Sequence, residues 1–212
     1  SFLLSALNHA RETAYLTKCF SNQRQIGLAV AMYGTDFNDY FPTMARGYSA
    51  GNNDCVLWSE WFYGGDDDPG KGWIKDSVPA DDRTMSNYLD PYSEVYHCPN
   101  DGASGGTPTW EWNTVSYPLN VLYKSYWNGW YRSLHDAIAD EVTQPSHTVL
   151  VGEESSIYVR LGPGVISDIP ALWWHPGGFE FKRTPLQFVG GHGDYISIAA
   201  NDYNNERYRY SP

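Results

Sequence analysis

The sequence predicts an α+β fold, in which one long N-terminal helix packs on a small antiparallel sheet and long aromatic-rich loops lie between them. Apolar residues recur at three- and four-residue steps from Leu3 to Phe37, as on one face of a helix. Strand-like runs bounded by turn residues concentrate in the last third of the chain. The 212 residues are enough for one domain with its own core.

The chain divides into three parts within this single domain. Residues 1–40 form the helical stem, which we expect to end near the Pro42 break. Residues 41–143 form a loop-rich insertion, because Gly, Pro, Asn, Asp and aromatic residues interrupt every apolar run there. Within this insertion we expect short helices around residues 81–89 and 133–141, and a short strand, SEVYH, before a turn.

Residues 144–212 form the C-terminal sheet. A turn at Pro145 leads into a buried strand that ends at Glu153, and residues 154–185 then form a long excursion rich in Gly, Pro and Trp. Alternating residues at 194–200 and 206–210 flank a polar turn, so we expect them to pair as a C-terminal β-hairpin.

Charge and motifs exclude several function classes. The formal net charge of -11 repels phosphate backbones and anionic lipid headgroups, so nucleic acid is not an expected partner. The chain has no run of about 18 apolar residues that would span a membrane. It also has no nucleophile elbow, phosphate loop or His-rich metal motif, so we do not expect an enzyme.

His192 and Asp202 have the types of side chain that catalytic pairs and metal sites use. Ten positions along an extended strand correspond to about 33 Å, which is too far for one local site. We therefore expect these two residues to mark the two ends of a strand.

Four blocks of the chain, in order, resemble one protein family. The first is the helix from Leu3 to Pro42, with Cys19 and Asn22, and the second is the turn HCPND, with Cys98, Pro99 and Asp101. The third is QPSHTVLVGE at 144–153, and the fourth is the His192 and Asp202 spacing. Together they resemble the type II secretion pseudopilin-like proteins with a C-terminal H-X9-DG motif. The glycine of that motif is Tyr203 in this chain, so the turn after Asp202 needs a different backbone shape.

The resemblance implies a pilin-like fold and a structural role in a type II secretion or type IV pilus-like system of the bacterial cell envelope. Members of the family begin with a prepilin leader and an apolar helix half, which anchors them in the inner membrane and stacks in a pseudopilus. We expect this chain to be the soluble domain without that half, in the periplasm or at the cell surface. Its expected partners are other pseudopilin subunits.

A rival hypothesis is a membrane-anchored module whose Trp-rich loops bind carbohydrate. Flat rings beside carboxylates and amides suit sugar faces, although the same rings could instead form small cores under the loops. A weaker third hypothesis is a hydrolase that uses two of Glu60, Glu111, Glu153 and Glu154. The rings considered as a carbohydrate platform are Trp58, Trp61, Trp110, Trp112, Trp127 and Trp130.

The cysteines and two acidic residues give further expectations. Cys19 lies on the apolar face of the helix and is expected as a buried thiol without a partner. Cys55 and Cys98 both lie in loops, so a disulfide between them and separate thiols both stay open. Similarity to the major pseudopilins, which bind calcium through a C-terminal loop, makes Glu153 and Asp202 candidate Ca²⁺ ligands. The alternative is that both residues simply cap strand ends.

Overall fold

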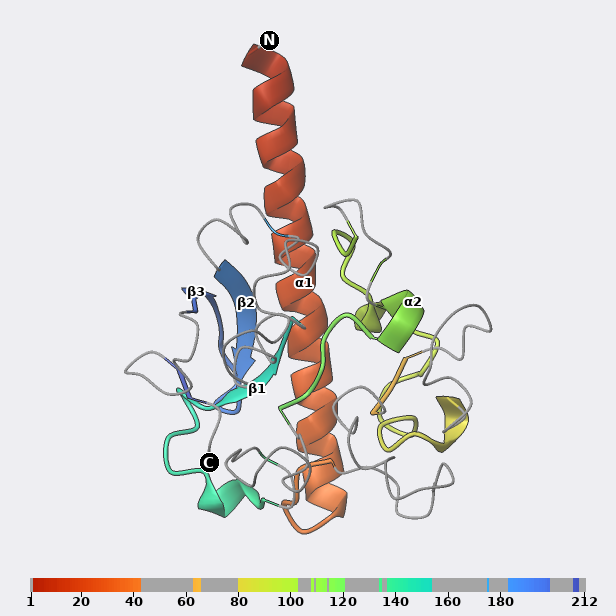
Figure 1. The fold of residues 1–212 in the computed structure, drawn as a ribbon. Helices are drawn as coiled ribbons and strands as arrows, with labels where there is room; N and C mark the ends of the chain where they lie inside the picture. Colours follow the sequence, from red (N-terminus) through yellow and green to blue (C-terminus); the bar gives the residue numbers. More distant parts are fainter. Residues whose placement is uncertain are drawn as a thin grey trace.

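A computed structural model gives the fold as one long helix, a three-stranded sheet and several short helical turns (Figure 1). The structure describes residues 2–42, 63–65, 80–102, 108, 110–113, 115–120, 134, 137–153, 175, 183–198 and 208–209. For a few of these, such as Trp112, it describes the backbone but not the side chain.

Helix α1, Phe2–Asp36, confirms the predicted stem. At a rise of 1.5 Å per residue its 35 residues span about 52 Å. The helix ends where Asn38 and Asp39 adopt left-handed backbone angles, with φ of 53° and 62°, a conformation that Asn and Asp tolerate better than most residues. Within the part of the chain that the structure describes, no helix combines the length and hydrophobicity needed to cross a membrane.

The two halves of α1 differ in their contacts. From Leu3 onward the first buried residue is Cys19, and every side chain before it is exposed or half-buried. After Cys19, one face of the helix is buried against the sheet and the loops. Figure 1 shows the N-terminal half extending beyond the rest of the molecule, with the sheet and the segment around α2 on opposite sides of the other half. The helix therefore consists of a projecting half and a docked half.

The sheet has the order β1-β2-β3 and is antiparallel throughout. Its strands are β1, Val149–Gly152; β2, Arg183–Phe188; and β3, Gly193–Ser197. Strand β1 is buried along its whole length, as predicted for the apolar run before Glu153. The α+β class and the small antiparallel sheet are confirmed.

The predicted C-terminal hairpin is wrong, because β3 pairs with β2 through the turn at 189–192. Gly191 lies in this turn with φ of 87°, a conformation that favours glycine. Arg209 instead forms a parallel bridge with Thr148, beside the start of β1. The first half of β2, up to Pro185, lay within the excursion predicted for residues 154–185, and the rest of β2 was not predicted as a strand; in the structure Pro185 pairs with Tyr195.

Three short elements of the insertion are 3₁₀ turns where helices or a strand were predicted. The segment expected as a helix at 81–89 contains only the 3₁₀ turn η2, Ala80–Asp82, and the one at 133–141 contains η4, Ala139–Glu141. The expected strand SEVYH is the 3₁₀ turn η3, Glu94–Tyr96, which the hydroxyl of Ser93 caps by accepting from the amide of Val95. A single-turn helix, α2, spans Trp110–Asn113.

The sheet separates two apolar cores. Leu150 and Val151 belong to the larger core, which also contains the docked face of α1 and buried side chains from the insertion. Leu186, Phe188 and Ile196 belong to a second, smaller core. Helix α1 therefore docks on a sheet whose strands also contribute to a second core.

Candidate functional site

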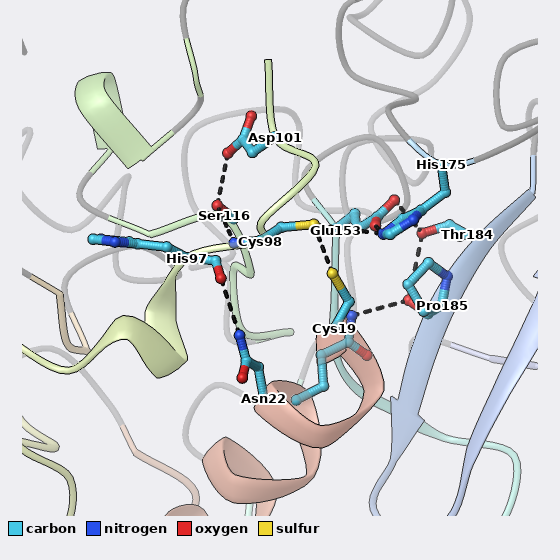
Figure 2. Close-up of polar contacts among 11 residues, drawn as sticks. Cys19, Asn22, His97, Cys98, Asp101, Ser116, Glu153, His175, Thr184 and Pro185 are labelled. Carbon is cyan, nitrogen blue, oxygen red and sulfur yellow. Dashed lines mark hydrogen bonds and ion pairs between the residues drawn. The ribbon is translucent and has the colours of Figure 1, made fainter. Parts of the chain in front are cut away.

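Four chemically active side chains meet where α1 enters the body of the protein (Figure 2). The sulfur atoms of Cys19 and Cys98 lie 2.6 Å apart, and the sulfur of Cys98 lies 3.5 Å from Nε2 of His175. Nε2 of His175 in turn lies 2.6 Å from Oε1 of Glu153. We call these residues the cysteine–histidine cluster.

The electrostatic centre of the cluster is the pair of His175 and Glu153. Burial alone would lower the pKa of His175, but the Glu153 carboxylate and the hydrogen bonds to Cys98 and Glu153 outweigh it and raise the pKa to about 10. The hydroxyl of Thr184, on β2, donates to Oε2 of Glu153 at 3.0 Å. At neutral pH the two side chains therefore form a buried ion pair, with His175 protonated.

The turn HCPND holds Cys98 in place. The Cys98 amide donates to the hydroxyl of Ser116 at 3.0 Å, and this hydroxyl donates to the Asp101 carboxylate at 2.6 Å. The amide of Asp101 donates back to the carbonyl of Cys98 at 3.0 Å, which closes the turn. Of the motif residues, Cys98 and Asp101 thus build one structure, while Pro99 is exposed.

The docked half of α1 is fastened on two sides of Cys19. Nδ2 of Asn22 donates to the carbonyl of His97 at 2.9 Å, and Nε2 of Gln23 donates to the carbonyl of Pro185 at 3.2 Å. Both amide side chains are fully buried. The same helical turn is therefore bound to the HCPND turn on one side and to β2 on the other.

The cluster offers three ligand atoms to a metal ion, because the sulfurs of Cys19 and Cys98 and a ring nitrogen of His175 lie within 4.8 Å of one another. The geometry fits zinc poorly. With Zn–S bonds of about 2.3 Å, tetrahedral ligands stand about 3.8 Å apart, whereas these sulfurs are 2.6 Å apart.

The cluster is closed to solvent. Cys19 and Glu153 have no exposed surface, Cys98 is 2% exposed and His175 is 3% exposed. The four side chains therefore belong to the interior of the described part of the chain.

His192 lies outside the cluster. It directly precedes β3, which confirms the prediction that it marks the start of a strand, but β3 ends at Ser197, so the strand is shorter than the predicted one that would reach Asp202. Its ring stacks on Phe188 with ring centres 4.6 Å apart, and its carbonyl accepts from the Phe188 amide at 2.9 Å. His192 thus closes the β2–β3 hairpin, while Asp202, the other end of the motif, lies outside the described residues.

Of the six tryptophans considered as a carbohydrate platform, the structure describes the side chain of Trp110 alone. Trp110 is half-buried and stacks on His97 with ring centres 4.5 Å apart, so this face packs against the protein. This contact agrees with the interpretation that the rings form small cores under loops. Outside the described residues lie Trp58, Trp61, Trp127 and Trp130, as does the side chain of Trp112.

The structure places the two cysteines differently from the sequence prediction. Cys19 is buried as expected, but its sulfur contacts Cys98, whereas Cys55, the partner considered for Cys98, lies outside the described residues. The spacing of Cys19 and Asn22 on one helix face could have suggested a shared partner. His175 was missed entirely, because a lone His in a Trp-rich stretch has no spacing that signals a site.

Glu153 has a role that the sequence did not suggest. As a Ca²⁺ candidate it would need free oxygens and several further oxygen ligands. In the structure its two oxygens face His175 and Thr184. Asp202, the second Ca²⁺ candidate, lies outside the described residues, so the paired calcium site stays a prediction.

No protein-family model, no curated protein and no solved structure matches this chain.

Proposed function

We propose that this protein is a structural, pseudopilin-like subunit of a type II secretion or type IV pilus-like system in the bacterial cell envelope. In this proposal α1 is the stem of a pilin-like fold, and the sheet with its loops is the globular head. The observation that supports it best is a second apolar face on α1, which the rest of the chain leaves exposed.

The second face consists of large apolar side chains in both halves of the helix. At 3.6 residues per turn, the four positions lie within about 60° of one another around the helix axis. Small residues at Ala10, Ala14 and Ser21 lie on the same line between them. The side chains of the second face are Leu3, Leu7, Leu28 and Met32.

The docked face lies on the other side of the helix. Cys19, Ile26 and Val30 are buried and lie roughly 150° around the axis from the second face. A helix that only covered its own sheet would need one apolar face. Two opposed apolar faces are what a stem requires when it packs on its own head and on neighbouring helices.

The exposed leucines argue for a partner on energetic grounds. Leu3 is 83% exposed and Leu28 is 59% exposed. Burying a leucine side chain contributes about 1.5–3 kcal/mol, so covering the whole second face would favour association. We propose that its occupant is the stem of another pseudopilin subunit, and that an apolar helix half preceding α1 anchors the assembly in the inner membrane.

Site-specific photo-crosslinking in the producing cell tests this function. A photoreactive phenylalanine analogue at Leu28 should form crosslinks to a second copy of this chain or to another pilin-type subunit, identified by mass spectrometry. The same analogue at Tyr92, which is similarly exposed at 54% but lies outside α1, is the matched control. The proposal fails if Leu28 gives no crosslinked pilin-type subunit, or no more of it than Tyr92 does.

A further inference from the structure

Cys19 and Cys98 are 79 positions apart in the chain, yet the fold brings their sulfur atoms to 2.6 Å. Carbon atoms in van der Waals contact stay about 3.5–4.0 Å apart, and sulfur is larger than carbon. In the structure both residues are free cysteines, and their separation is shorter than two thiols in contact would keep and longer than the about 2.05 Å of an S–S bond. Cys19 approaches from the rigid helix α1 and Cys98 from a hydrogen-bonded turn, so both backbones already present the sulfurs to each other.

We infer that Cys19 and Cys98 form a disulfide bond that fastens the stem helix to the HCPND turn. The bond lies where it has the greatest mechanical effect. Cys19 is the first buried residue of α1 counted from Leu3, so the link stands at the boundary between the projecting and docked halves. It would stop the docked half from peeling away when the projecting half is pulled.

The surroundings favour a permanent bond over a reactive thiol pair. Burial raises the pKa of the Cys98 thiol well above its usual value, which disfavours the thiolate needed for nucleophilic attack or metal binding. The nearest base among the described residues, His175, has its Nε2 2.6 Å from Oε1 of Glu153, and this carboxylate favours the protonated ring over a neutral one that could take a proton from a thiol. With Cys98 only 2% exposed, a reductant would reach the finished bond with difficulty.

The bond forms by thiol–disulfide exchange with a donor disulfide, such as that of an envelope thiol–disulfide oxidoreductase. The two cysteine thiols lose two protons and two electrons as their S–S bond forms. The S–S bond of the donor breaks, and its two sulfurs take up the protons and electrons as thiols. Because both sulfurs are buried in the folded protein, the exchange takes place while the chain folds.

This inference goes beyond the proposed function and is independent of it. The bond requires only folding in an oxidising compartment, so it would hold equally in a protein that never assembles. Conversely, if Cys19 and Cys98 were found not to be bonded, the second apolar face of α1 would still be exposed and the proposed function would still stand.

Peptide mapping of the wild-type protein gives the direct test. The protein is produced in a bacterial periplasm, alkylated under denaturing conditions without reductant, and digested for mass spectrometry. We expect one crosslinked pair of peptides containing Cys19 and Cys98, and alkylation of Cys55 alone. A Cys55–Cys98 or Cys19–Cys55 pair would overturn the inference, as would three alkylated cysteines after refolding with oxidised glutathione.

Metal analysis and variants complete the test. One equivalent of zinc with all three thiols alkylated would show that the cluster is a metal site instead. If the disulfide is present, we expect Cys19→Ser, Cys98→Ser and the double variant to lower the melting temperature by the same amount. We expect reductant to lower the melting temperature of the wild type but not that of these three variants. Cys55→Ser is the matched control and should keep both the crosslinked peptide and the wild-type melting temperature. Additive losses in the double variant would contradict a shared bond.

Discussion

The side chain of Asn22 donates a hydrogen bond of 2.9 Å to the carbonyl oxygen of His97, one helical turn after Cys19 contacts Cys98. Nδ2 also lies 3.4 Å from the carbonyl of Glu94. The polar contact and the sulfur contact thus join the same turn of α1 to the same loop. This double connection fixes the described segment from η3 to the HCPND turn on the helix.

The first prediction concerns this hydrogen bond. Asn22→Ala would remove this hydrogen bond to the part-buried carbonyl of His97, so we expect a loss of about 1–3 kcal/mol in the free energy of unfolding, measured by urea denaturation. Asn8→Ala, on the exposed part of the same helix, is the control and should be neutral or slightly stabilising because Ala favours helix. Equal effects at the two positions would show that the Asn22 contact contributes nothing.

The second prediction concerns pH. The folded protein holds the His175 proton up to about pH 10, whereas an unfolded His loses it near 6.5. The stabilisation is therefore fully present below about pH 6.5 and is lost as the pH rises towards 10. We expect the urea midpoint of the wild type to fall steadily between about pH 6.5 and 9.

Glu153→Gln removes the charge that holds this proton. We expect it to cost roughly 3–5 kcal/mol near neutral pH, because it leaves a buried group without its counter-charge, and to flatten the pH dependence. The control is Glu94→Gln, which changes the 3.6 Å contact between His97 and the exposed carboxylate of Glu94 and should alter stability little. If Glu153→Gln keeps the wild-type slope, His175 is not the group that titrates.

The third prediction separates the two apolar faces of α1. Ile26 is fully buried, so Ile26→Ala should cost about 2–5 kcal/mol in the free energy of unfolding of the isolated domain. Leu28, two residues away, faces solvent, so Leu28→Ala should change this free energy by about 0.5 kcal/mol or less. The same Leu28 variant should weaken association with other pilin-type subunits. A large loss of stability in the isolated Leu28 variant would mean that the head itself covers the second face.

The fourth prediction concerns calcium. Because His175 and Thr184 already occupy the oxygens of Glu153, we expect neither millimolar calcium nor a calcium chelator to change the melting temperature. Magnesium is the control for general ionic effects. A rise with calcium alone that disappears in Asp202→Asn would show a calcium site in the C-terminal loop and restore the family-based expectation.

The sequence predicted the elements that leave a clear local pattern of apolar residues. Helix α1 follows from the apolar spacing, and β1 follows from four consecutive buried residues after a turn. Strand β2 was missed, and its pairing with β3 depends on the rest of the fold. The 3₁₀ turns replaced predicted helices because short segments take their shape from tertiary contacts.

The cysteine–histidine cluster could be predicted only in part. Cys19, Cys98 and Glu153 each belong to a block of the family resemblance, so the sequence identified three of its four members without placing them together. Their meeting depends on how α1, η3 and β1 pack, which no spacing along the chain reveals. His175 contributes the fourth side chain from a stretch with no recognisable pattern.

The central claim is that α1 is the stem of a pilin-like subunit, and the N-terminus of the protein isolated from its native membranes tests it most directly. We predict a processed N-terminus, left by cleavage of a prepilin leader, followed by about 20 apolar residues that run into Leu3 in continuous helical register. A mature protein in which a polar segment or a separate folded domain leads into Leu3 would contradict the claim.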